Sequence, residues 1–180
     1  MVWRKGKSMM KAIKYGFIFC LIFVIVGFTS CEKIISDNEE GNKRVKEIIG
    51  YLESNDAEGL KSLFCEKIQS SKDLDEQIQA ALDFFEGEMI SYDSKGILVN
   101  SGKASGYGNG RRYSYYHISP RVKYIQTTAE KVYEIGFNAD IINVDQPDRI
   151  GISELRIKDE DDNKCVIGDF YLANHEKNIC

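Results

Sequence analysis

The spacing of apolar residues changes once along this chain, from a period of three to four before residue 86 to a period of two after it. Three segments before that point place one apolar stripe on a helix. The stripes are Val45, Ile48, Ile49 and Leu52; then Leu60, Leu63, Phe64 and Ile68; then Leu74, Ile78, Ala81, Leu82 and Phe85. We therefore predict three amphipathic helices, the first over residues 42–54.

Short polar segments separate these stripes and supply caps. Asn55-Asp56 provides an N-cap for the second helix. Ser70 and Ser71 end that helix, and Asp73 with Glu76 three residues later matches a capping box for the third. Both ends of the second helix are thus predicted from local chemistry.

Residues from Gly87 onward alternate apolar and polar side chains, as half-buried strands do. We predict strands at Gly87–Ser94, Arg112–Thr127, Lys131–Val144, Ser153–Lys158 and Lys164–Ile167. Pro120 interrupts the second of these, which places it at an edge or a bulge. The glycine-rich stretch Lys95–Arg111 is predicted to be a mobile hairpin loop, and Asp159–Asn163 a turn rather than a calcium loop.

Helices first and a one-faced antiparallel sheet second predict an α+β fold. In this fold three N-terminal helices pack on one face of a curved antiparallel sheet. The domain covers residues 42–168, and residues 169–180 form a C-terminal tail.

The N-terminal segment predicts export. Phe17–Val26 is an unbroken run of ten apolar residues, which is short for a bilayer of about 30 Å and typical of a signal-peptide core. Ser30 immediately before Cys31 resembles the lipobox of bacterial lipoproteins, which implies cleavage between these residues and a diacylglycerol on Cys31. Residues 1–30 are then a signal peptide and 31–41 a tether. An uncleaved anchor helix is the alternative, and translation could start at Met1, Met9 or Met10.

The charged residues also differ before and after residue 30. The whole chain carries −4, but residues 1–30 hold five basic and no acidic side chains, which leaves 19 basic and 28 acidic side chains, or −9, beyond them. A surface of that sign disfavours nucleic acid and anionic lipid headgroups as partners. We expect an extracytoplasmic domain that is lipid-anchored to the cell membrane through diacylglycerol on Cys31.

Several segments carry a family resemblance. They are Asn55–Phe64 (NDAEGLKSLF), Phe84–Gly87 leading into Ser91-Tyr92, Tyr116–Ile118, and Gly151–Glu154. Together they resemble a family of Gram-positive lipoproteins of unknown function, over about residues 40–168. The resemblance implies the cone-shaped fold of nuclear transport factor two and the ketosteroid isomerases, and it brings no assigned chemistry.

Candidate chemical groups are sparse. By alternation His117 shares a face with Tyr115, and if that face lines the mouth of the cone the two could bind a polar ligand group or act in general base catalysis. A structural histidine is the simpler interpretation. His175 has no convergent partner for a metal. The alternating polar positions are predicted to form a solvated or subunit-contacting outer face, through which a homodimer could form; they are Glu134, Asn138, Asp140, Glu154 and Arg156.

No catalytic set is identifiable, and we expect no cofactor and no metal site. A ketosteroid isomerase needs a carboxylate base and an oxyanion hole of tyrosine and protonated acid, and no such trio stands out. Cys65, Cys165 and Cys180 lack a C-x-x-C spacing and are predicted to be buried thiols, with a Cys65–Cys165 disulfide as the alternative.

Three functions remain after these exclusions. The first is a membrane-anchored surface lipoprotein whose domain binds an unknown ligand or protein without catalysis. The second is an immunity or inhibitor lipoprotein, since an acidic anchored domain suits neutralising a basic partner. The third is an enzyme that works in the cone through His117.

Overall fold

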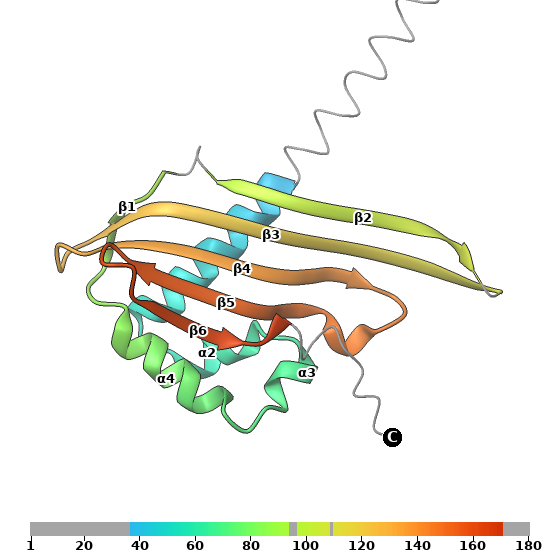
Figure 1. Ribbon diagram of the computed structural model, residues 1–180, viewed down its shortest axis with the longest axis horizontal. Coiled ribbons are helices and arrows are strands. Elements are labelled where there is room, and N and C mark those ends of the chain that lie inside the picture. The colour runs from blue at the N-terminus through green and yellow to red at the C-terminus, as the bar shows by residue number, and fades with distance from the viewer. Residues whose placement is uncertain (1–36, 94–96, 109, 171–180) are drawn as a thin grey trace, which may run out of the picture. The chain divides into compact units, whose positions relative to one another are not determined.

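A computed structural model describes residues 37–93, 97–108 and 110–170. The predicted signal peptide, Ser30, Cys31, His175 and Cys180 lie outside these ranges. The described part is an α+β domain in which a few helices accompany a curled antiparallel sheet (Figure 1). No helix within the described ranges is both long and apolar enough to span a bilayer.

The helical part begins earlier than the stripes predicted. Residues 37–53 are helical, and α2 (Ala57–Ser62), α3 (Glu66–Gln69) and α4 (Leu74–Phe84) follow. The end of the expected tether is therefore part of a helix, and Asp37 and Gly41 are buried. At the start of α2, Asp56 accepts a hydrogen bond from the Gly59 amide at 2.8 Å, as expected of an N-cap. The capping box predicted for α4 is absent, because the Asp73 side chain makes no capping hydrogen bond.

The second predicted helix is split in two by the sheet. Its middle, Leu63 to Cys65, bonds to the first residues of a strand: the Ile152 amide donates to the Leu63 carbonyl at 2.8 Å, and the Cys65 amide donates to the Ile152 carbonyl at 2.9 Å. Phe64 consequently forms a parallel bridge with Ile152. Backbone groups that a continuous helix would use are taken by this contact, so the apolar stripe survives while the helix breaks.

Six strands form the sheet. They are β1 (Met89–Ser91), β2 (Leu98–Gly108), β3 (Arg111–Thr127), β4 (Val132–Asn143), β5 (Gly151–Asp159) and β6 (Lys164–Gly168), with the short 3-10 turn η1 (Pro147–Arg149) before β5. All pairings are antiparallel, in the order β1-β3-β4-β5-β6, and β2 also pairs with β3.

Two sequence predictions about this sheet are wrong. Most of the glycine-rich stretch is strand β2, because its backbone pairs with β3 over eleven registered positions and needs little from its side chains. Pro120 lies inside β3, between β2 and β4, at neither an edge nor a bulge; it pairs with Val99, and the β3–β4 register shifts only at Tyr116/His117 and Val122/Ile125.

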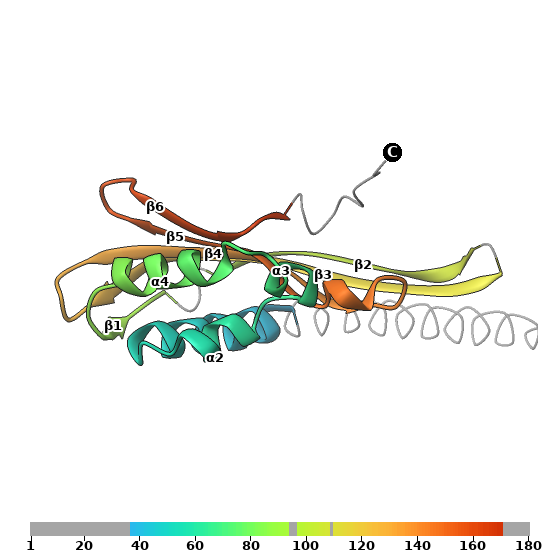
Figure 2. The same cartoon turned by 90° about the horizontal axis from the view of Figure 1, so that it is seen from below.

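The helices lie on one face of the sheet (Figure 2). Strand side chains on that face are buried against them, among them Ile118, Val122, Ile135, Phe137 and Leu155. These residues and the helix stripes form one continuous apolar core. We call the opposite side of the sheet the outer face; it carries the residues that alternate with the core positions.

Asp37 fixes the start of the helical part to the β2–β3 hairpin. Its carboxylate, 5% exposed, accepts hydrogen bonds from Ser101 Oγ at 2.5 Å, Lys103 Nζ at 2.6 Å and Tyr116 OH at 2.7 Å. Burial alone would raise the pKa of Asp37, but these donors and the Lys103 charge together lower it to about 2. The helix is thus bound to the hairpin through an ionised carboxylate.

Candidate functional site

His117 and Asp140 meet on the outer face of the sheet. His117 lies on β3 directly opposite Asp140 on β4, next to a register shift between the two strands. The core residue Ile118 follows His117, so His117 points away from the helices. His117 Nδ1 lies 2.9 Å from Asp140 Oδ1, and the side chains are 18% and 5% exposed.

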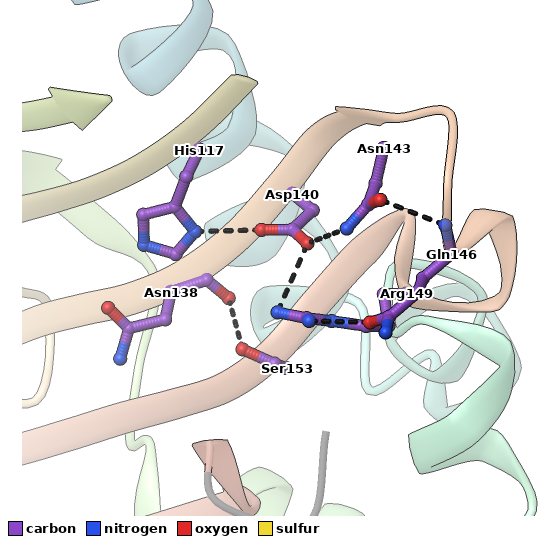
Figure 3. A network of polar contacts seen from close by, with 7 residues as sticks. All are labelled: His117, Asn138, Asp140, Asn143, Gln146, Arg149 and Ser153. Atoms are coloured by element: carbon purple, nitrogen blue, oxygen red, sulfur yellow. Dashed lines mark hydrogen bonds and ion pairs between the residues drawn. The ribbon is translucent and has the colours of Figure 1, made fainter. Parts of the chain in front are cut away.

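The Asp140 carboxylate has further partners from the end of β4 and from η1. Asn143 Nδ2 donates to Oδ2 at 2.9 Å, and an Arg149 guanidinium nitrogen lies 3.4 Å from the same oxygen. Gln146 joins the two, because its amide donates to the Asn143 side-chain oxygen at 2.9 Å and its own side-chain oxygen accepts from Arg149 at 2.7 Å (Figure 3). The carboxylate is therefore held from both of its oxygens.

Asp140 is ionised in this setting. Burial by itself would raise the pKa of Asp140, but the hydrogen bonds from His117 and Asn143 and the positive charge of Arg149 outweigh it, so the pKa is lowered. An ionised carboxylate can only accept hydrogen bonds. His117 must therefore carry a proton on Nδ1, and in its neutral form Nε2 has a free lone pair.

The other ring nitrogen of His117 points away from the polar network (Figure 3). Among the described residues no hydrogen bond to Nε2 is formed. The ring is flanked by aromatic side chains: it stacks with Tyr115 at a centroid distance of 6.2 Å and an interplanar angle of 9°, and Phe170 meets its edge at 6.3 Å. Burial raises the pKa of Tyr115, with the Asp140 charge adding to this. Nε2 is thus an oriented acceptor on a partly covered ring.

Tyr115 and His117 share a face, as alternation predicts, but that face is turned away from the apolar interior. The remaining outer-face residues do not converge on them. Glu134 accepts from Arg121 Nε at 2.5 Å, and Arg156 Nε lies 2.9 Å from Glu154. Asp140 is buried and not solvated as expected, because Asn143 at the end of β4 and Arg149 in η1 contact its carboxylate.

Other candidate groups remain separate from this site. Within the described ranges no three histidine, cysteine or acidic side chains are placed to hold a metal ion. Cys65 and Cys165 are free thiols, and burial raises the pKa of both. In the turn after β5, Asp159 accepts from the amides of Asp161 and Asn163, as a turn-forming aspartate does.

Sequence reasoning singled out His117 and Tyr115 and missed what holds them. Asn143 ends β4, Gln146 follows it and Arg149 lies in η1, and no spacing in the sequence relates them to His117. The signal that could have found the pair was the alternation itself, which put His117 and Asp140 on the polar face of two predicted strands; their register was the missing information.

A comparison with protein families gives one match. The model described as a domain of unknown function (DUF5104) covers residues 47–161, which is more than half of the chain and includes β1 to β5 with the His117 and Asp140 positions. A comparison with curated proteins gives no match.

Proposed function

Because this chain belongs to that family of domains of unknown function, we propose its role from its own residues: the domain is a binding module that contacts a ligand or partner protein through the outer face of its sheet. The observation that carries the proposal is His117. Its ring is fixed by a buried, ionised carboxylate, and its second nitrogen points away from the polar network, where the neutral ring offers an acceptor. Holding a ring in this way prepares it for a hydrogen bond from a partner.

The interior supports the same choice. The space between helices and sheet is filled by one cluster of apolar side chains, with Phe137, Ile118 and Leu155 at 1% exposure or less. A ligand in the centre of the domain would have to displace these residues. The resemblance to the nuclear-transport-factor-two fold therefore remains a proposal about the chain's shape, and the interior cavity used by ketosteroid isomerases is not part of it.

A second candidate function is catalysis at the same residue. A histidine bonded through Nδ1 to an ionised carboxylate can accept a proton at Nε2 from bound water or substrate. We rank it below binding, because the outer-face acids Glu134 and Glu154 are engaged with arginines and do not converge on His117. An immunity or inhibitor role would be a special case of partner binding by this face, as would a homodimer.

We also propose that the domain is extracytoplasmic and anchored by a diacylglycerol on Cys31. The support is the sequence: the apolar run Phe17–Val26 and the Ser30-Cys31 junction. Mass spectrometry of the membrane form tests this directly. An N-terminal, lipid-modified Cys31 supports the anchor, and an unmodified Cys31 still joined to Ser30 contradicts it.

Site-specific photo-crosslinking in cells tests the binding proposal. A photoreactive phenylalanine derivative at Tyr115 should give a discrete adduct, and the additional substitution His117→Ala should abolish it. Tyr51, an aromatic residue on the helix 37–53, provides the matched control position. Equal adducts from positions 115 and 51, or an adduct indifferent to His117→Ala, would refute the outer face as the binding surface.

A further inference from the structure

The outer face also carries a basic groove, centred four residues along β3 and β4 from His117 and Asp140. It is a hollow of about 360 Å³ whose lining includes Arg121, Arg156, Lys158 and Lys164 together with Glu134 and Gly136. Four cations meet here on a domain whose residues 31–180 carry −9. Basic side chains thus gather at one place on a domain whose net charge is negative.

The strand register shows how the groove is built. Arg121 on β3 pairs with Gly136 on β4, which pairs with Arg156 on β5. Directly opposed residues project to the same side, so the two arginines flank a position without a side chain. Their backbones are two strand spacings apart, about 10 Å. In the next row Glu134 pairs with Lys158, and Lys158 with Lys164.

Gly136 forms the floor of the groove. A Cβ added there would lie 3.6 Å from the Pro120 carbonyl oxygen and 3.9 Å from Arg121 Cγ, which are ordinary contacts. The backbone therefore tolerates a side chain at this position. Glycine instead leaves the groove open. A larger side chain would fill the space between Arg121 and Arg156.

Nearby acids do not neutralise these cations. Arg121 bonds Glu134, Arg156 bonds Glu154, and Lys158 pairs with the exposed Asp162. Lys123 also lies 4.0 Å from Glu134. The groove lining contains four cations and one acid, Glu134, and the side chains of Arg121 and Arg156 are 51% and 54% exposed. Both arginines retain donors for a further oxyanion, because each guanidinium has five N–H groups.

We propose that this groove binds a small multivalent oxyanion of the phosphate-ester class, with Arg121 and Arg156 on either side of Gly136 as the recognising pair and Lys158 and Lys164 at one end. Arginine forks match the geometry of phosphate oxygens. A set of four cations suits more than one negative charge. The inference rests on the groove alone and requires neither the His117 site nor the lipid anchor.

Calorimetric titration of the full chain in nonionic detergent at low salt tests the proposal, with inorganic pyrophosphate as the probe. We expect saturable binding that weakens at least about tenfold with Arg156→Gln or Arg121→Gln, since each removes a charge-assisted contact. Gly136→Val should weaken binding similarly while every charge remains. The matched control is Arg44→Gln, which removes an equally ion-paired arginine from the helix 37–53 and should change the affinity less than twofold.

A second titration uses short-chain phosphatidic acid, because its phosphomonoester headgroup offers the same phosphate chemistry and can carry two negative charges. Tighter binding of pyrophosphate assigns a soluble phosphate compound, and tighter binding of the lipid assigns a headgroup; either supports the groove when Arg156→Gln weakens that binding at least about tenfold. Absence of saturable binding by both probes overturns the proposal. Equal weakening by Arg44→Gln and Arg156→Gln also overturns it, since net charge alone would then explain binding.

Discussion

Replacing Asp140 by alanine is expected to lower the free energy of unfolding by about 3–5 kcal/mol, the usual cost of breaking a buried charge pair from one side. The substitution removes the acceptor of His117 Nδ1 and of Asn143 Nδ2, two hydrogen bonds to a charged group worth about 1.5–3 kcal/mol each. Arg149 keeps Gln146 as a partner but loses the carboxylate 3.4 Å away. Asp140→Asn retains the size and one acceptor oxygen, so it should cost less.

Urea unfolding followed by circular dichroism measures this effect. Asp145→Ala is the matched control, because Asp145 is an exposed aspartate five residues along the chain and surface substitutions usually change stability by no more than about 0.5 kcal/mol. Combining Asp140→Ala with His117→Ala should recover about 1–3 kcal/mol of coupling in a double-mutant cycle. Equal effects of Asp140→Ala and Asp145→Ala, or additive single effects, would refute the network as the support of His117.

Three further outcomes follow from the same structure. The pKa of Asp37 is about 2 in the fold against an ordinary 3.8, so its ionised form should add about 2 kcal/mol to the free energy of unfolding, fully present above about pH 4 and lost as the pH falls through 2. Urea midpoints measured from pH 6 to 2 should show this loss, and Asp37→Asn should flatten the pH dependence. Gly151→Ala should destabilise the fold by about 1–3 kcal/mol, because φ is +123° and a Cβ would lie 2.8 Å from the Cys65 amide nitrogen. Gly50→Ala lies inside a helix with open space around it and should stabilise the fold by about 0.5–1 kcal/mol, and thermal melts measure both effects. Buried Cys65 should resist alkylation until urea unfolds the domain; rapid labelling of the native protein would contradict its burial.

The spacing of apolar residues predicts which segments pack into the core better than it predicts where helices and strands begin and end. The stripe from Leu60 to Ile68 was correct as an apolar surface, but Leu63 to Cys65 leaves the helical path to bond the start of β5, a contact between residues nearly ninety positions apart. The glycine-rich stretch reads as a loop because glycine has low strand propensity, yet backbone pairing with β3 holds it as β2. Both errors come from tertiary bonds that local sequence does not encode.

The site shows the same division. Alternation placed His117, Tyr115 and Asp140 on polar strand faces, and the register of β3 against β4 then decided that His117 and Asp140 meet. The sequence predicts a solvated Asp140, because nothing in it shows that Asn143 at the end of β4 and Arg149 in η1 contact its carboxylate. Asp37 was assigned to a tether for a similar reason, since its three partners lie 64 to 79 residues further along the chain.

The central claim is that ionised Asp140 holds His117 with its proton on Nδ1 and its Nε2 lone pair on the outer face. A long-range ¹H–¹⁵N NMR spectrum of histidine-labelled protein, at a pH where the ring is neutral, tests it most directly, and His117→Ala distinguishes the signals of His117 from those of His175. We expect a protonated Nδ1 and an unprotonated Nε2. An Nε2-protonated tautomer with a bare Nδ1 would contradict it.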